Sequence, residues 1–209
     1  QPSWISIKKT LKESFDVFLN QIFPTLYNAF SVLLLGVFCG PVANGLFDAG
    51  TKLVDISQQF LKIISRTFFP FLSRKIDKHT LFSKIYMLFT LIVTLGLIFF
   101  APFLIPVFFS EEFSESIKVL RLMAISGVFL TMSNIYGTNY LIIIGRERSL
   151  RNLTMYASLL GFVIAIPLIY YGGYMGAVAI IVFVRMLLGV GSYLLAYNCK
   201  KNICKKNLL

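Results

Sequence analysis

Charged and polar residues recur at helical spacing within an otherwise apolar segment, residues 45–72. Successive members are four, three, four, three and four residues apart, so all of them lie on one face of a helix. We call this set the charged stripe; its members are Asp48, Lys52, Asp55, Gln59, Lys62 and Arg66. If the segment crosses a membrane, each charge facing lipid costs about 2.5–3.5 kcal/mol, so Lys52, Asp55 and Lys62 alone would cost roughly 8–10 kcal/mol. The stripe is therefore expected to face a water-filled cavity or polar partners.

Two interpretations of the charged stripe are open from the sequence. In the first, Asp48, Lys52 and Asp55 form an internal ladder of ion pairs that only holds the helices together. In the second, the stripe lines a cavity that receives a substrate. The surplus cations Lys62 and Arg66 favour the cavity, because packing alone has no use for unpaired positive charge.

Further polar residues lie in other apolar segments and are candidates to line the same cavity. They are Asn20, Asn28, Asn134, Thr138, Arg121 and Arg185. Asn20 and Asn28 equally suit ordinary hydrogen bonds between helices. Arg121 lies one turn from the end of its segment, so its guanidinium could equally extend to the membrane surface. Arg185 lies near the middle of its segment, where an arginine either has a function or pairs with a carboxylate elsewhere.

The composition decides which class of protein these residues belong to. Hydrophobic residues make up 57% of the 209 residues and charged residues only 14%, and the mean hydropathy is +0.78. A soluble domain carries about 25% charge, so an ordinary soluble enzyme, a disordered chain and a disulfide-rich secreted module are excluded. The remaining class is an all-α, polytopic membrane protein.

Signals for catalysis and for metal binding are absent from the sequence. There is one histidine, His79, and the three cysteines form no CxxC pair, so neither a zinc site nor a histidine-based catalytic cluster is expected. The HExxH, GxSxG, P-loop and GxGxxG motifs are absent as well. We therefore expect no catalytic residues, no metal ligands and no cofactor.

Six apolar segments are long enough to cross a membrane as helices, which need about 20 residues each. The predicted spans are 16–38, 45–72, 82–109, 117–144, 152–171 and 175–197. Residues 1–14 are expected to form an amphipathic approach on the cytoplasmic side, residues 15–197 a six-helix lobe, and residues 198–209 a basic cytoplasmic tail. Glycine and proline mark the tight turns at Gly40-Pro41 and Gly172-Gly173.

The charge of the loops alternates along the chain. The N-terminal approach, the loops 73–80 and 145–151, and the tail hold 13 of the 20 Lys and Arg, whereas the other three turns hold none. Because basic loops stay on the cytoplasmic side, this pattern predicts six spans with both termini cytoplasmic. It also accounts for the formal net charge of +11 without nucleic acid as a partner.

Several short strings, in this order and spacing, are similar to a known family. They are Leu35-Gly36, GLFDAGTKL over 45–53, FPFLSR over 69–74, IKVLRLMA over 117–124, Gly145-Arg146 and YMGAVA over 174–179. The chain resembles the C-terminal half of polysaccharide-type flippases, above all the O-antigen flippases (Wzx type), of the multidrug/oligosaccharidyl-lipid/polysaccharide exporter superfamily. The resemblance covers nearly the whole chain.

This resemblance implies a fold, a substrate and partners. It implies one lobe of a twelve-helix protein that flips undecaprenyl-diphosphate-linked oligosaccharide, the O-antigen repeat unit, across the bacterial inner membrane by alternating access, in the course of lipopolysaccharide synthesis. Residue 1 is Gln rather than Met, which suggests part of a longer protein. Because only six of the twelve helices are predicted in this chain, we expect either a missing N-terminal lobe or assembly with a second copy. Membrane lipid, a polysaccharide polymerase and a chain-length regulator are expected partners. Asp48 and Asp55 are candidates to carry coupling protons or sodium ions.

Other functions remain as alternatives. A cation-coupled multidrug exporter would need a net acidic cavity, but the charged stripe sums to +1, with three cations and two carboxylates. A membrane enzyme of polysaccharide assembly, such as a polymerase, would need a long outer loop or a catalytic base, and the predicted outer loops are short. A purely structural subunit would tolerate neutralisation of the stripe.

Overall fold

The chain folds as a bundle of long helices. The computed structural model describes residues 4–206, and no strand occurs in this range. It describes the side chains of the same range except at 4–13, 16–17, 20–21, 24 and 201–206. The helices are α1 (Trp4–Arg74), η1 (Ile76–Lys78), α2 (His79–Phe109), η2 (Glu111–Phe113), α3 (Ser116–Met132), η3 (Ser133–Ile142) and α4 (Glu147–Lys206). The expected approach at 4–14 and tail at 198–206 are continuous with α1 and α4; residues 1–3 and 207–209 lie outside the described range.

Two of these helices bend sharply at a glycine. Gly40 in α1 has φ 80° and ψ 179°, and Gly173 in α4 has φ 54° and ψ −139°. A positive φ strains side chains other than glycine, so both residues suit a reversal of the chain. The bends lie at the predicted turns and divide α1 and α4 into two arms each.

Four stretches of the described chain are long and apolar enough to cross a membrane. They are Thr25–Arg74, Ile76–Phe109, Ser116–Ile142 and Glu147–Lys200. Two of the predicted spans, 16–38 and 45–72, lie within α1, and two more, 152–171 and 175–197, lie within α4. The chain is thus a multi-pass membrane protein by length and composition, and the count of six spans stays a prediction.

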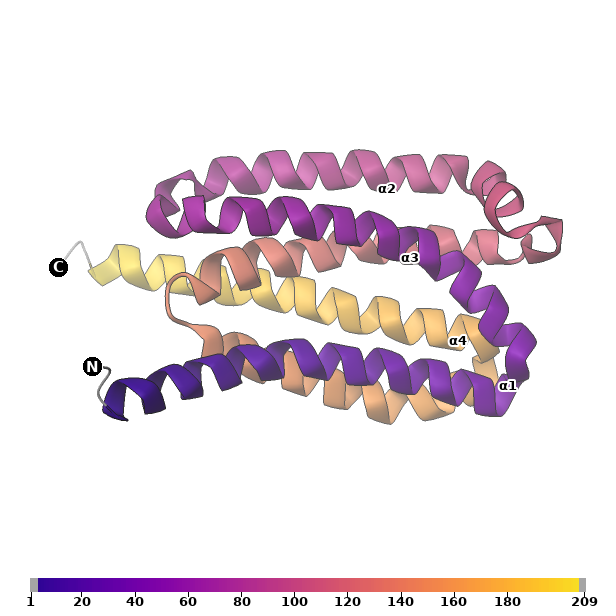
Figure 1. Ribbon diagram of the computed structural model, residues 1–209, viewed down its shortest axis with the longest axis horizontal. Helices are drawn as coiled ribbons and strands as arrows, with labels where there is room; N and C mark the ends of the chain where they lie inside the picture. The colour runs from indigo at the N-terminus through magenta and orange to yellow at the C-terminus, as the bar shows by residue number, and fades with distance from the viewer. Residues whose placement is uncertain (1–3, 207–209) are drawn as a thin grey trace.

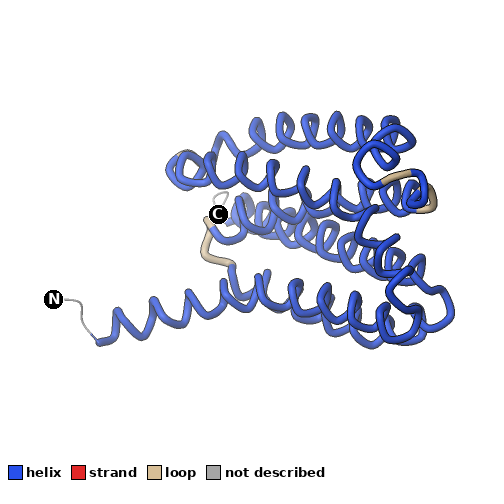
Figure 2. The backbone as a smooth tube through the Cα atoms, turned by 45° about the vertical axis from the view of Figure 1, so that its right-hand side comes forward, coloured by secondary structure: helices blue, strands red, loops and turns tan. Residues whose placement is uncertain are grey.

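The arms run roughly along one axis, so the connections gather at two ends of the bundle. The first described residues of α1 and the last of α4 lie at the same end, together with the link from α1 to α2 (Figures 1 and 2). The bend of α1, the bend of α4 and the link from α2 to α3 lie at the other end (Figure 1).

The core lies where α4 packs against α1 and α3. Leu35, Leu120 and Ile180 are among its fully buried side chains. Phe99 and Phe103 of α2 are instead exposed, as expected for a surface that contacts lipid. The bundle therefore has an apolar interior, with two smaller clusters beside the main core, and an apolar outer surface. Exposed charge on a long helix is unusual on such a surface.

Residues Ser133–Ile142 continue α3 as a π-helix. A π-helix of ten residues is long, because this geometry mostly occurs as single-turn bulges. Asn139 within it is buried, and its Nδ2 donates to Ser65 Oγ of α1 over 2.8 Å. The side-chain directions of this segment therefore differ from those that a regular α-helical period predicts.

Candidate functional site

The charged stripe occupies one face of the second arm of α1, between Gly40 and Arg74. All six of its side chains are exposed. The buried residues of the same arm, which include Val54, Leu61 and Leu72, face the core. The helical spacing that predicts a common face is thus realised, and that face lies outside the packed core of this chain.

Arg185 brings the stripe together with two other helices. Its guanidinium Nη2 lies 3.9 Å from Asp55 Oδ1, and its Nη1 donates to Ser126 Oγ over 2.9 Å. The Arg185 side chain is 10% exposed, whereas that of Asp55 is 52% exposed. A guanidinium has five N–H donors, so these contacts satisfy only part of its capacity. One buried cation therefore lies directly behind the stripe and points at its central carboxylate.

The ladder Asp48–Lys52–Asp55 is not formed among the described residues, where no salt bridge joins these side chains. Asp55 pairs across helices with Arg185 instead. Asp55 is thus the carboxylate partner of Arg185, which the sequence alone could not identify. Lys62 and Arg66 likewise form no ion pair with a described residue. The exposed cations of the stripe are thus available to a further partner.

A buried amide lies beside this cluster. Gln58, next to the stripe on α1, is buried, and its Oε1 has no hydrogen-bond partner in the described part of the chain. A Cβ added to Gly127 of α3 would lie 2.5 Å from Gln58 Nε2, so the amide occupies space that a larger residue at position 127 would need. The hydroxyl of Tyr27, on the first arm of α1, is also buried without a described partner.

The remaining predicted residues are dispersed. Asn28 is half-buried on the first arm of α1, and Asn134 and Thr138 are half-buried on η3. The Nε of Arg121 donates to the backbone oxygen of Ile98 in α2 over 3.4 Å, and Arg121 forms no hydrogen bond or ion pair with the stripe in the described part of the chain. The side chain of Asn20 lies outside the described residues.

Sequence reasoning missed Ser126 and Gln58. Ser126 is an isolated polar residue in its part of α3, whereas Gln58 directly precedes Gln59 of the stripe but is not among its predicted members. Only the packing of α1, α3 and α4 reveals that Ser126 holds Arg185. Among the described residues, no group of three or more His, Cys, Asp or Glu could hold a metal ion.

Comparisons with known proteins show which proteins this chain is similar to. Residues 3–76, which include the whole stripe, match the family described as "Polysaccharide biosynthesis protein". A protein of Shigella dysenteriae named "Putative O-antigen transporter" is 30% identical over 185 residues, which are 86% of this chain and 46% of the relative. A protein of the same name from Escherichia coli strain K12 is 23% identical over 175 residues, 78% of this chain and 41% of the relative.

The chain therefore spans about half the length of the curated relatives it matches. No solved structure matches it. The family resemblance predicted from the sequence is confirmed by these matches.

Proposed function

We propose that this chain, which is similar to a polysaccharide biosynthesis family and to proteins named as O-antigen transporters, belongs with those transporters and forms one half of a transporter for an undecaprenyl-diphosphate-linked oligosaccharide. The transporter would move the O-antigen repeat unit across the bacterial inner membrane by alternating access and would not act as an enzyme. The multidrug exporter and the enzyme of polysaccharide assembly are less well supported, because the relatives are named as O-antigen transporters.

One observation carries the proposal: a row of exposed charges lies on a helix arm in an otherwise apolar bundle. These charges are too costly to face lipid. They fit a water-filled cavity closed on its other side by the rest of a longer protein or by a second copy. The share of the relatives that the chain spans favours the first of these.

The topology that goes with this function has six spans with both termini cytoplasmic. If each arm of α1 and α4 crosses the membrane separately, the bends at Gly40 and Gly173 would divide the chain into six passes. The loops 73–80 and 145–151, which carry Lys and Arg, would then lie in the cytoplasm.

The chemistry of the stripe suits a diphosphate linked to sugars. Lys52, Lys62 and Arg66 would attract the diphosphate or acidic sugars, because exposed ammonium and guanidinium groups bind phosphoryl oxygens. Arg185, which now pairs with Asp55, would bind the same anion in place of that carboxylate. Asp48 and Asp55 would carry coupling protons or sodium ions. Hydrogen bonds to sugar hydroxyls would come from Asn20, Asn28, Asn134 and Thr138.

The test is an export assay with the full-length protein in its host. The double substitution Lys62→Ala and Arg66→Ala should lower surface polysaccharide at least tenfold and leave lipid-linked repeat units on the cytoplasmic side. The matched control is Lys84→Ala with Lys118→Ala, which removes two exposed cations of α2 and α3 outside the stripe. Both variants must reach wild-type levels in the membrane. Unchanged surface polysaccharide in the stripe variant would refute the proposal.

A further inference from the structure

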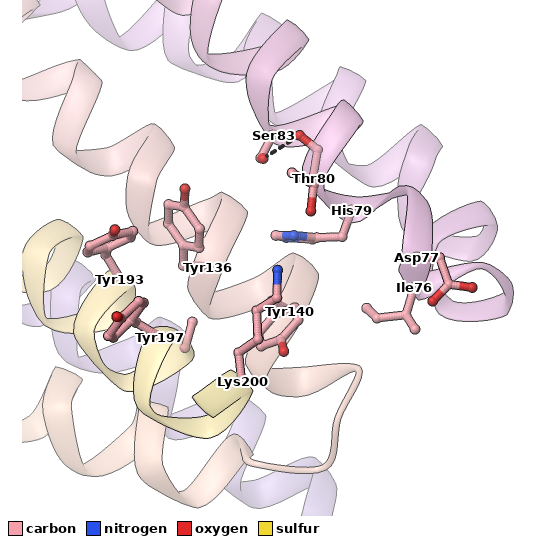
Figure 3. A pocket seen from close by; sticks show the side chains of 11 residues that line it. Ile76, Asp77, His79, Thr80, Ser83, Tyr136, Tyr140, Tyr193, Tyr197 and Lys200 are labelled. Atoms are coloured by element: carbon pink, nitrogen blue, oxygen red, sulfur yellow. Dashed lines mark hydrogen bonds between the residues drawn. The ribbon is translucent and has the colours of Figure 1, made fainter. Parts of the chain in front are cut away.

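A cavity of about 470 Å³ lies at the end of the bundle where α1 joins α2 and α4 ends. Its walls come from three segments far apart in sequence: η1 with the first turns of α2, the π-helix η3, and the last turns of α4 (Figure 3). No member of the charged stripe lines it. The cavity is therefore a separate feature from the proposed transport site.

Aromatic rings and one histidine build its walls. The ring centroids of His79 and Tyr140 are 5.0 Å apart, as are those of Tyr136 and Tyr193, and Tyr197 extends the wall along α4. His79 is buried, and its Nε2 lies 3.0 Å from the backbone oxygen of Ile135. Because a carbonyl oxygen only accepts, His79 must carry a proton on Nε2 and donate it. This bond fixes the start of α2 to the π-helix.

The polar groups that line the cavity are mostly donors without a described partner. The hydroxyls of Tyr136, Tyr140, Tyr193 and Tyr197 make no hydrogen bond to a described residue. Lys200 extends toward His79 (Figure 3), and within the described range its ammonium group pairs with no carboxylate. Several phenol hydroxyls and an ammonium group together suit an oxyanion with several acceptor oxygens.

The charge around the cavity has the same sign. Asp77 is the carboxylate of the lining, but Arg74, Lys75 and Lys78 flank it in sequence and are exposed. With Lys200, these four cations and one carboxylate leave a net charge of +3. Tyrosine and lysine gather where a membrane protein meets the headgroup layer, and basic pockets between spanning helices favour anionic lipids there.

We propose that this cavity binds the phosphoryl headgroup of an anionic membrane lipid. The Lys200 ammonium and the tyrosine hydroxyls would donate to the phosphoryl oxygens, while the rings contact the glycerol carbons. The acyl chains would continue along the exposed apolar side chains of α2, such as Leu81 and Ile85. Because Tyr136 and Tyr140 belong to the π-helix, the bound lipid would also hold that segment in place.

The test measures lipid binding to the full-length protein by native mass spectrometry, after detergent has removed bound lipid. The probes are phosphatidylglycerol and, as a zwitterionic reference, phosphatidylcholine. Phosphatidylglycerol should bind in preference. Lys200→Gln should weaken its binding at least fivefold, and Thr80→Phe, which fills the cavity from an exposed lining position, should do the same. Lys118→Gln, an exposed cation at the other end of the bundle, should change binding less than twofold.

Removal of the negative charge from the lining gives the sharpest outcome. Asp77→Asn should strengthen phosphatidylglycerol binding two- to fivefold, because it removes the carboxylate that repels the phosphoryl group. Weaker binding in this variant would overturn the proposal in favour of a cationic ligand. Equal losses in Lys200→Gln and Lys118→Gln would overturn it in favour of general charge attraction. Displacement of the lipid by millimolar inorganic phosphate would assign the cavity to a soluble anion instead.

Discussion

Replacing Asp55 with asparagine should destabilise the folded protein by about 1–2 kcal/mol, because it leaves the buried guanidinium of Arg185 without a counter-charge. Asparagine keeps the size of the side chain and removes only its charge. The hydrogen bond from Arg185 Nη1 to Ser126 Oγ remains in the variant. The loss of free energy therefore reports the ion pair rather than a change in packing.

The magnitude follows from the distance and the exposure of the pair. Two unit charges 3.9 Å apart attract by about 4 kcal/mol at an effective dielectric constant near 20. The Asp55 side chain is 52% exposed, so water screens much of this attraction. Loss of a partner from a fully buried pair costs about 3–5 kcal/mol, and the half-exposed geometry places Asp55→Asn below that range.

The assay is unfolding of the full-length protein in mixed micelles as the fraction of denaturing detergent rises, combined with a double-mutant cycle. Arg185→Met replaces the buried cation by an apolar chain of similar length. In that background Asp55→Asn should cost less than about 0.5 kcal/mol, because the charge that it strands is gone. Asp48→Asn is the matched control, since Asp48 is exposed on the same helix and pairs with no described residue.

An equal loss from Asp55→Asn in the two backgrounds would refute the reasoning, since the energy would not depend on Arg185. A loss from Asp48→Asn as large as that from Asp55→Asn would do the same. It would mean that any carboxylate on this face of α1 stabilises the folded protein through its long-range attraction to the many cations of the chain, and not through an ion pair with Arg185.

Two further predictions follow from helix packing and from topology. Gly189→Ala should destabilise by about 1–3 kcal/mol, because its Cβ would lie 2.6 Å from the backbone oxygen of Phe129. Gly96→Ala, where no atom lies within 4 Å of the new Cβ, should be neutral or stabilising in the same unfolding assay. In a cysteine-free background, Ser114→Cys should react with a membrane-impermeant maleimide in spheroplasts, and Ser73→Cys only after the inner membrane is opened. Labelling of both in intact spheroplasts would contradict the six-span topology.

The general fold could be predicted because membrane helices obey few and strong rules. Apolar segments of sufficient length and basic loops indicate a helical bundle. Glycine at positions 40 and 173 marks the bends, because a positive φ leaves little choice of residue. The π-helix Ser133–Ile142 could not be predicted, since its Asn, Tyr and Thr residues are equally compatible with an α-helix.

The spacing of the charged stripe predicted its common face, but no sequence pattern predicted what lies behind it. Arg185 is 130 residues from Asp55 and 59 from Ser126, and their meeting depends on how three helices are aligned along the bundle. From the sequence we could predict only that some carboxylate was a candidate partner of Arg185, not that this carboxylate is Asp55.

The spacing of tyrosines in the sequence could have predicted the aromatic cavity. Tyr136 and Tyr140 are four residues apart, as are Tyr193 and Tyr197, near segment ends where interfacial tyrosines gather.

In the proposed function, the order of charges along the stripe would bear on the direction of transport. From Asp48 to Arg66 the arm rises about 27 Å at 1.5 Å per residue, close to the roughly 30 Å of the hydrocarbon core. The carboxylates Asp48 and Asp55 lie in the half nearer the bend at Gly40, and Lys62 and Arg66 lie in the half nearer the basic loop 73–80. In the proposed topology the cations near the basic loop would attract an anionic diphosphate from the cytoplasmic side. The carboxylates would lie nearer the opposite side of the membrane and would repel it from their end of the stripe. Exchanging the charges of Asp48 and Arg66 should therefore slow both entry and release, because the anion would meet a carboxylate where it enters and a cation where it leaves.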